Sequence, residues 1–127
     1  MADKKDLRKI DIGKDGEKIA ADYLKKNGYR IDELNYRCPI GEIDIIAHDR
    51  NDVVFVEVKS RKSDALGYPE EAVGNRKQRK MSQLALWYLQ ERKLDKTCAR
   101  FDVVAILSLP SGHDIRLIKN AFDFISS

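Results

Sequence analysis

The sequence has few cysteines and no long apolar run, so it is neither a disulfide-rich protein nor one that spans a membrane with helices. Cys38 and Cys98 are the two cysteines among 127 residues, far apart and without a CxxC pair, so neither a disulfide framework nor a cysteine-type zinc site is expected. No stretch approaches the roughly 18 apolar residues of a membrane span. The polar start from Met1 to Asp6 carries acids, unlike a signal or transit peptide. We therefore expect a cytoplasmic protein without membrane association.

Two common catalytic motifs are also absent. No glycine-rich phosphate loop occurs, which excludes nucleotide hydrolysis of the P-loop type. Ser60 has no histidine at motif spacing, so a serine nucleophile is not expected.

Length and charge bound the organisation of the chain. Its length predicts one domain over residues 13–127, preceded by a charged, frayed lead-in over residues 1–12. The net charge is only +3, but the segment from Lys59 to Lys80 holds seven bases and three acids, so the positive excess lies there. Such a run is typical either of a solvated face or of a surface that contacts phosphates.

Periodicity and turn residues predict an α/β fold, with helices flanking a central mixed sheet in the order α-β-β-β-α-β-β. The expected helices are Lys14–Asn27 with Gly28 as its stop, Glu70–Arg92 with a break near Gly74 left open, and a short end at Ala121–Ile125. The expected strands are Tyr29–Tyr36, Gly41–His48, Val53–Ser60, Phe101–Leu109 and Ile115–Ile118, with a loop over Arg61–Pro69.

The hairpin of the second and third expected strands contains most of the candidate catalytic residues. A symmetric turn about Arg50 and Asn51 would pair these residues across the strands: His48 with Val53, Ile46 with Phe55, Asp44 with Glu57, and Glu42 with Lys59. The other face would then be apolar, with Ile43, Ile45, Ala47, Val54, Val56 and Val58.

The acids of this hairpin have two interpretations. Like charges placed directly opposite each other destabilise a sheet, and a divalent cation between Asp44 and Glu57 would turn their repulsion into coordination. Alternatively, they face solvent and Lys59 neutralises them. The run from Val53 to Val56 is apolar on both faces, as in an interior strand, where unpaired charge is costly.

Glu17 is a third candidate acid. On a helix it lies on the same stripe as Ala20, Ala21 and Leu24, which predicts that it faces the packing partner of the helix. The alternative is a simple helix-dipole effect, since an acid in a first turn is favourable.

The second long helix begins with cations. Arg76, Lys77, Arg79 and Lys80 lie early in it, where the helix dipole disfavours positive charge, so an incoming anion would be attracted there. A nucleic-acid backbone is the obvious anion.

The hairpin strings Gly41-Glu42-Ile43-Asp44-Ile45-Ile46-Ala47 and Val54-Phe55-Val56-Glu57-Val58-Lys59-Ser60-Arg61 resemble the D-(spacer)-E-x-K signature of the PD-(D/E)XK superfamily of restriction-endonuclease-like nucleases. Over nearly the whole chain, the sequence resembles the YraN-like family of uncharacterised bacterial proteins. Besides the hairpin, this resemblance rests on Gly16-Glu17, the stretch from Tyr68 to Val73, Lys77-Gln78-Arg79, Tyr88-Leu89 and the stretch from Arg100 to Val104. That family is similar in layout to archaeal Holliday-junction resolvases. Leu66 stands where this pattern has an aromatic residue.

The resemblance implies roles for individual residues. Asp44 and Glu57 would hold Mg²⁺ or Mn²⁺ with the carbonyl of Val58, and Glu17 would complete the acidic set. Lys59 would orient the attacking water or help to deprotonate it, and would stabilise charge on the phosphate. Gln78 or Lys77 would touch the substrate or the edge of the site. The expected nucleic-acid contacts are Arg61, Lys62, Arg76, Lys77, Gln78, Arg79 and Lys80.

Three functions remain open at this point. The first is a metal-dependent endonuclease that hydrolyses DNA, including branched or damaged DNA. The second is a nucleic-acid-binding module of nuclease ancestry that no longer cuts. The third is an interaction protein whose acidic cluster and basic helix bind another polypeptide. A homodimer is also left open.

Overall fold

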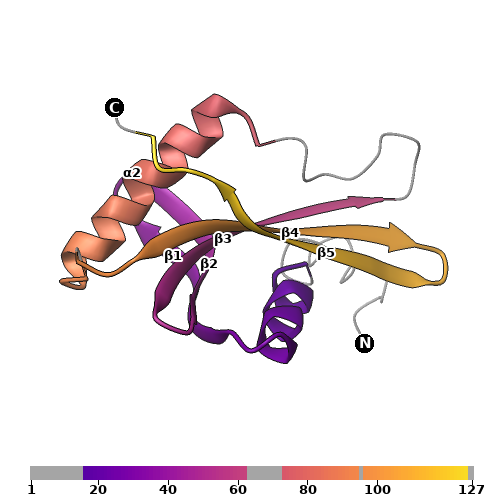
Figure 1. Cartoon of the computed structure of the whole chain (residues 1–127). Coiled ribbons are helices and arrows are strands. Elements are labelled where there is room, and N and C mark those ends of the chain that lie inside the picture. Colours follow the sequence, from indigo (N-terminus) through magenta and orange to yellow (C-terminus); the bar gives the residue numbers. More distant parts are fainter. Residues whose placement is uncertain (1–15, 63–72, 95, 126–127) are drawn as a thin grey trace, which may run out of the picture.

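The computed structural model describes residues 16–62, 73–94 and 96–125. Figure 1 shows a sheet with a helix on each face: residues 16–26 form one helix, and α2 (Asn75–Glu91) covers the opposite face. The strands are β1 (Arg30–Cys38), β2 (Gly41–Asp49), β3 (Asp52–Lys62), β4 (Ala99–Leu109) and β5 (Gly112–Phe122). The α/β class and the order α-β-β-β-α-β-β are confirmed. None of the described helices is both long and apolar enough to cross a membrane.

The sheet is mixed, with spatial order β1-β2-β3-β4-β5. Neighbouring strands are antiparallel except β3 and β4, which are parallel. A parallel pair needs a crossover connection, and α2 lies within it. After this crossover the start of the basic helix contacts the middle of β3, where Nζ of Lys77 lies 3.4 Å from Oε1 of Glu57.

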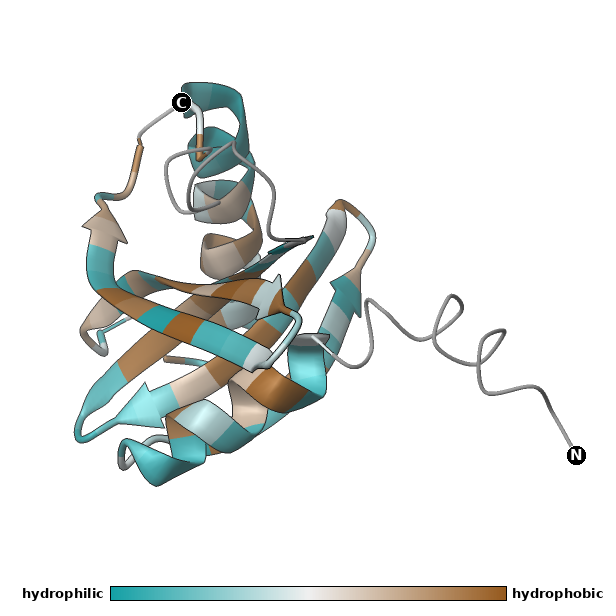
Figure 2. Cartoon of the chain, turned by 90° about the vertical axis from the view of Figure 1, so that its right-hand side faces the viewer, coloured by the Kyte–Doolittle hydropathy of each residue, from teal (hydrophilic) through white to brown (hydrophobic). Residues whose placement is uncertain are grey.

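Two apolar clusters fill the faces of the sheet. The helix over residues 16–26 packs Ala20, Ala21 and Leu24 on the cluster that contains Ile45, Ala47, Val54, Val56, Val104 and Ile106. α2 packs its buried residues on the cluster that contains Ile43, Ile46, Val53, Phe55, Phe101 and Phe122. Because β3 is buried on both faces, it is apolar through Val53–Val56, and Figure 2 shows brown, hydrophobic residues along the central strands.

The predicted hairpin register is confirmed near the turn and wrong beyond it. Ile46 pairs with Phe55 and His48 with Val53, but the ladder ends at Ile45 and Val56. Asp44 with Glu57 and Glu42 with Lys59 are therefore not ladder partners. Ile43 packs in the α2 cluster rather than with Ile45, so the expected apolar face is also wrong at this position. On the N-terminal side of Ile45, towards Gly41, β2 no longer pairs with β3.

Some element boundaries also differ from the prediction. Arg61 and Lys62 continue β3 instead of starting a loop. Ala121 and Phe122 end β5, and residues 123–125 form no helix. This end stays extended because Phe122 pairs with Phe101 and stacks on its ring at 4.7 Å between centroids. α2 begins at Asn75, after the non-helical residues Val73 and Gly74. The expected lead-in, most of the expected loop and residues 70–72 lie outside the described residues.

Candidate functional site

The strands β2 and β3 separate at one end, and the predicted carboxylates lie at this fork. Val58 would pair with Ile43 if the register of the hairpin continued. Instead, the backbone N–H of Val58 donates to the Asp44 carboxylate, with 2.9 Å between N and Oδ2. The N–H and C=O of a strand residue point to the same side, so the carbonyl of Val58 also faces the fork.

Asp44 lies close enough to Glu57 at the fork to influence the ionisation of the Glu57 carboxyl. The Glu57 side chain is 13% exposed, and burial is the main cause that raises its pKa, with the charge of Asp44 raising it further. Burial likewise raises the pKa of Asp44, against which the hydrogen bond from Val58 acts. The prediction of two interacting carboxylates therefore has a physical basis in the structure, although no ladder pair holds them.

Two lysines lie near these carboxylates. Lys59, the lysine of the motif, lowers the pKa of both Asp44 and Glu57. Lys77 of α2 lowers both more strongly, and its Nζ lies 3.4 Å from Oε1 of Glu57. The sequence grouped Lys77 with the basic surface of the helix, and the family resemblance implied that Lys77 or Gln78 would touch the substrate or the edge of the site. In the structure the Lys77 ammonium lies at this edge, against Glu57.

Glu17 approaches the fork from the helix over residues 16–26. Burial raises the pKa of its carboxyl, a hydrogen bond with Asn35 lowers it, and the charges of Asp44 and Glu42 raise it. Asn35 has φ 53°, a left-handed conformation that asparagine tolerates better than most residues. Sequence reasoning missed Asn35, and this tolerance is the one signal that could have pointed to it.

A glycine brings this helix close to β3. A Cβ built on Gly16 would lie 2.7 Å from Oγ of Ser60, closer than side-chain atoms pack. The absence of a side chain at Gly16 thus lets the helix lie against β3 beside Val58 and Ser60.

The donors at the fork fit a hard divalent cation such as Mg²⁺, because all of them are oxygens. Among the described residues, however, no three His, Cys, Asp or Glu side chains converge to hold a metal. A bound cation would therefore rest on Asp44, Glu57 and the carbonyl of Val58, with water completing its shell. Direct ligation by Glu17 stays a prediction.

The outer surface of α2 carries the remaining cations of the predicted patch. Arg76, Arg79 and Lys80 are exposed, and with Gln83 they line an open cavity of about 270 Å³. Gln78 is half-buried and donates from Nε2 to the carbonyl of Val73 at 2.8 Å, beside the helix start. Arg61 lies on β3, as does Lys62, whose side chain is outside the described part. Contacts of these residues with nucleic acid stay predictions.

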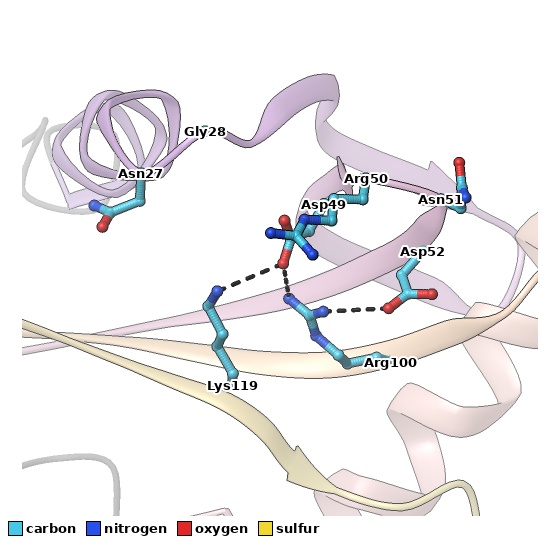
Figure 3. A pocket seen from close by; sticks show the side chains of 8 residues that line it. All are labelled: Asn27, Gly28, Asp49, Arg50, Asn51, Asp52, Arg100 and Lys119. Atoms are coloured by element: carbon cyan, nitrogen blue, oxygen red, sulfur yellow. Dashed lines mark hydrogen bonds and ion pairs between the residues drawn. The ribbon is translucent and has the colours of Figure 1, made fainter.

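A second polar cluster lies at the opposite, turn end of the hairpin and borders a cavity of about 690 Å³ (Figure 3). Its centre is Arg100, which donates to Asp49 at 2.8 Å, to Asp52 at 3.3 Å and to Asp102 at 2.9 Å. Lys119 lies 3.5 Å from Asp49. Sequence reasoning did not identify this cluster as a unit.

The charges of this second cluster are paired with one another. Asp102 is fully buried and also accepts from the Tyr29 hydroxyl at 2.8 Å and from the backbone N–H of Asn120 at 2.9 Å. The network therefore fastens the β2–β3 turn to β4 and β5, and we interpret it as structural. His48 lies near the same turn, hydrogen-bonded to Asp32 and Arg30, far along the hairpin from the fork as the sequence predicted.

The sequence profile of Uncharacterised protein family UPF0102 matches residues 16–106, which is most of the chain. The chain belongs to this family. A UPF0102 protein of Syntrophus aciditrophicus is 58% identical over 111 residues, covering 87% of each chain. Others are 43% identical in Syntrophotalea carbinolica, covering 91% of this chain and 94% of the relative, and 49% identical in Clostridium botulinum strain Loch Maree, covering 88% and 94%.

Membership of UPF0102 confirms the resemblance to the YraN-like family. The segment matched by the UPF0102 profile contains both helices and every residue of the fork, from Glu17 to Lys77, and ends within β4. The names of these relatives state no activity. The function of this UPF0102 protein is therefore argued from the chemistry of the fork.

Proposed function

We propose that this UPF0102 protein is an endonuclease that hydrolyses phosphodiester bonds of DNA with Mg²⁺ or Mn²⁺. The observation that carries the proposal is the pair of Asp44 and Glu57 at the fork, two carboxylates whose pKa values burial raises. A hairpin gains nothing in stability from such a pair. A divalent cation bound between them would compensate the negative charges of both carboxylates.

The cation would polarise the phosphate and lower the pKa of a bound water. Asp44 and Glu57 would hold it, and the hydrogen bond from Val58 fixes one of these ligands in place. Lys59, next to Val58 on the same strand, would hold the attacking water and stabilise the charge that builds on the phosphate.

The exposed cations of α2 supply a surface for the DNA backbone. Arg76, Arg79 and Lys80 lie on the same helix as Lys77, whose start has no side-chain cap and no acid in its first turn. Phosphates bind well to such a combination of side-chain charge and helix dipole. These contacts are independent of sequence, so we expect DNA shape, branched or damaged, to decide the preference. A DNA substrate also implies a cytoplasmic location.

The test is cleavage of a panel of linear, flapped and four-way DNA by the purified chain with Mn²⁺ or Mg²⁺. We expect cleavage that is lost with EDTA and in Asp44→Asn, a variant that removes the ligand charge but keeps its shape. Binding of the panel without cleavage by any form would favour the alternative, a nucleic-acid-binding module of nuclease ancestry. Absence of both binding and cleavage would contradict the proposal.

A further inference from the structure

Lys77 pairs with an acid on another element rather than on its own helix. It lies in the first turn of α2, where no acidic residue is present and the N-cap Gly74 offers no side chain. Positive charge is unfavourable at this end of a helix. Its ammonium is nevertheless held 3.4 Å from Oε1 of Glu57. The ion pair thus offsets two unfavourable arrangements, the cation at the helix start and the buried carboxylate.

The Lys77 ammonium is paired with the Glu57 carboxylate, which a divalent cation at the fork would need as a ligand. Glu57 is 13% exposed, so its oxygens can be approached from few directions, while the Lys77 side chain is 46% exposed and can swing outward on its flexible stem. Of the two lysines near the fork, Lys77 exerts the larger electrostatic effect on Asp44 and Glu57. Lys77 therefore stands as a counter-ion of the carboxylate pair.

We propose that Lys77 is a second functional lysine of the fork: it competes with the divalent cation for Glu57 and, once released, contacts the phosphate of the substrate. This inference rests on the proposed function. A released Lys77 remains beside Arg76 and Lys80 at the start of α2, between the carboxylates and the exposed cations. A phosphate bound at the fork would then give the ammonium a new anionic partner.

The experiment measures Mn²⁺ binding and DNA cleavage separately in Lys77→Gln. Mn²⁺ affinity is measured by calorimetry without DNA, and single-turnover cleavage is measured at saturating Mn²⁺. Lys77→Gln should bind Mn²⁺ at least about fivefold more tightly, because a competing charge close to the ligand is gone. Its cleavage should fall by about 100-fold, the usual loss when one group that stabilises phosphate charge is removed. Thermal melting checks that the variant is folded.

A matched control is Lys26→Gln, which removes the same charge from the exposed end of the helix over residues 16–26 and should equal the wild type in both measurements. Unchanged Mn²⁺ affinity in Lys77→Gln, or wild-type cleavage at saturating Mn²⁺, would overturn the role of Lys77. Absence of cleavage by the wild type itself is a different result, because it would overturn the proposed function.

Discussion

The Asp44 carboxylate accepts the backbone N–H of Val58 at the point where β2 and β3 part. One side chain thereby ends a strand ladder and is itself held in a fixed direction. The hydrogen bond favours the ionised form of Asp44, while burial opposes it. Asp44 is thus a pre-oriented carboxylate. Its raised pKa shows that the groups around it compensate for only part of the cost of burying its negative charge.

A divalent cation should stabilise the folded chain. Binding to the folded state is linked to unfolding, so Mg²⁺ or Mn²⁺ at about 100 times its Kd contributes about 2.7 kcal/mol. The melting temperature should then rise on the order of 10 °C, as measured by calorimetry. No shift at millimolar metal would contradict the site.

The double variant Asp44→Asn/Glu57→Gln should lose this response and be more stable than the wild type without metal. Because the pKa of both acids is raised by folding, their ionisation opposes folding at neutral pH. That cost is fully present above the folded-state pKa values and disappears below the unfolded values of about 4. The advantage of the double variant should therefore be lost on acidification.

Lys59→Ala should separate cutting from binding. One lysine among several phosphate contacts matters little for affinity, so DNA binding should stay within about threefold of the wild type while cleavage is abolished. Gel-shift titration and single-turnover kinetics measure the two effects. Equal losses of binding and cleavage would assign Lys59 to the binding surface instead.

Neutralising the exposed start of α2 should weaken binding to every DNA sequence alike. Arg76→Gln/Arg79→Gln removes two cations that line the open cavity and leaves Lys77 in place. The slope of log affinity against log salt should fall by up to about 1.8, at roughly 0.9 per lost phosphate contact. Stability should hold or rise slightly, because these charges oppose the helix dipole. An unchanged salt slope would mean that the surface is merely solvated.

The second polar cluster predicts a pH-dependent stability. The hydrogen bond from Arg100 holds the pKa of Asp49 below its usual range, so the ionised carboxylate stabilises the fold above the unfolded pKa of about 3.9. That contribution is lost as the pH falls through the folded-state pKa. Asp49→Asn should therefore cost on the order of 1 kcal/mol at pH 7, and the cost should shrink progressively as the pH falls below about 4, as measured by urea unfolding.

Asp52→Asn is the matched control for that prediction. Asp52 shares Arg100 at the longer distance of 3.3 Å and its side chain is 38% exposed, so its loss should cost less than that of Asp49 at neutral pH. Equal costs of the two substitutions at every pH would show that the ion pair of Asp49 adds nothing specific.

Local pattern was sufficient to predict the hairpin turn, the interior strand and the pairing of Ile46 with Phe55. These follow from the chain's own alternation of side chains. The separation of β2 and β3 could not be predicted from this alternation, because it depends on a hydrogen bond between the backbone N–H of Val58 and the side chain of Asp44. The end of β5 was missed for a similar reason, since the stacking of Phe122 on Phe101 outweighs a weak helical pattern.

In the candidate site, too, some residues could be predicted from local sequence pattern and others could not. The acids Asp44 and Glu57 are recognisable from the hairpin because their strands are adjacent in sequence. Lys77 reaches Glu57 only through the crossover, so this contact did not follow from the pattern of the helix, although the family resemblance implied Lys77 or Gln78 at the edge of the site. Asn35 is a partner of Glu17 from another element, the strand β1, and no periodicity marks it.

The departure of β2 leaves the last residues of β3 with a strand partner on one side only, within the described part of the chain. Residues 57–62 pair with β4, and the backbone groups that face away from β4 form an edge inside the sheet. Such an edge invites strand addition by another molecule, and lysines along it discourage that association. Lys59 thus lies where its charge also opposes self-assembly. Replacing it with valine should promote aggregation even where it leaves the fold intact.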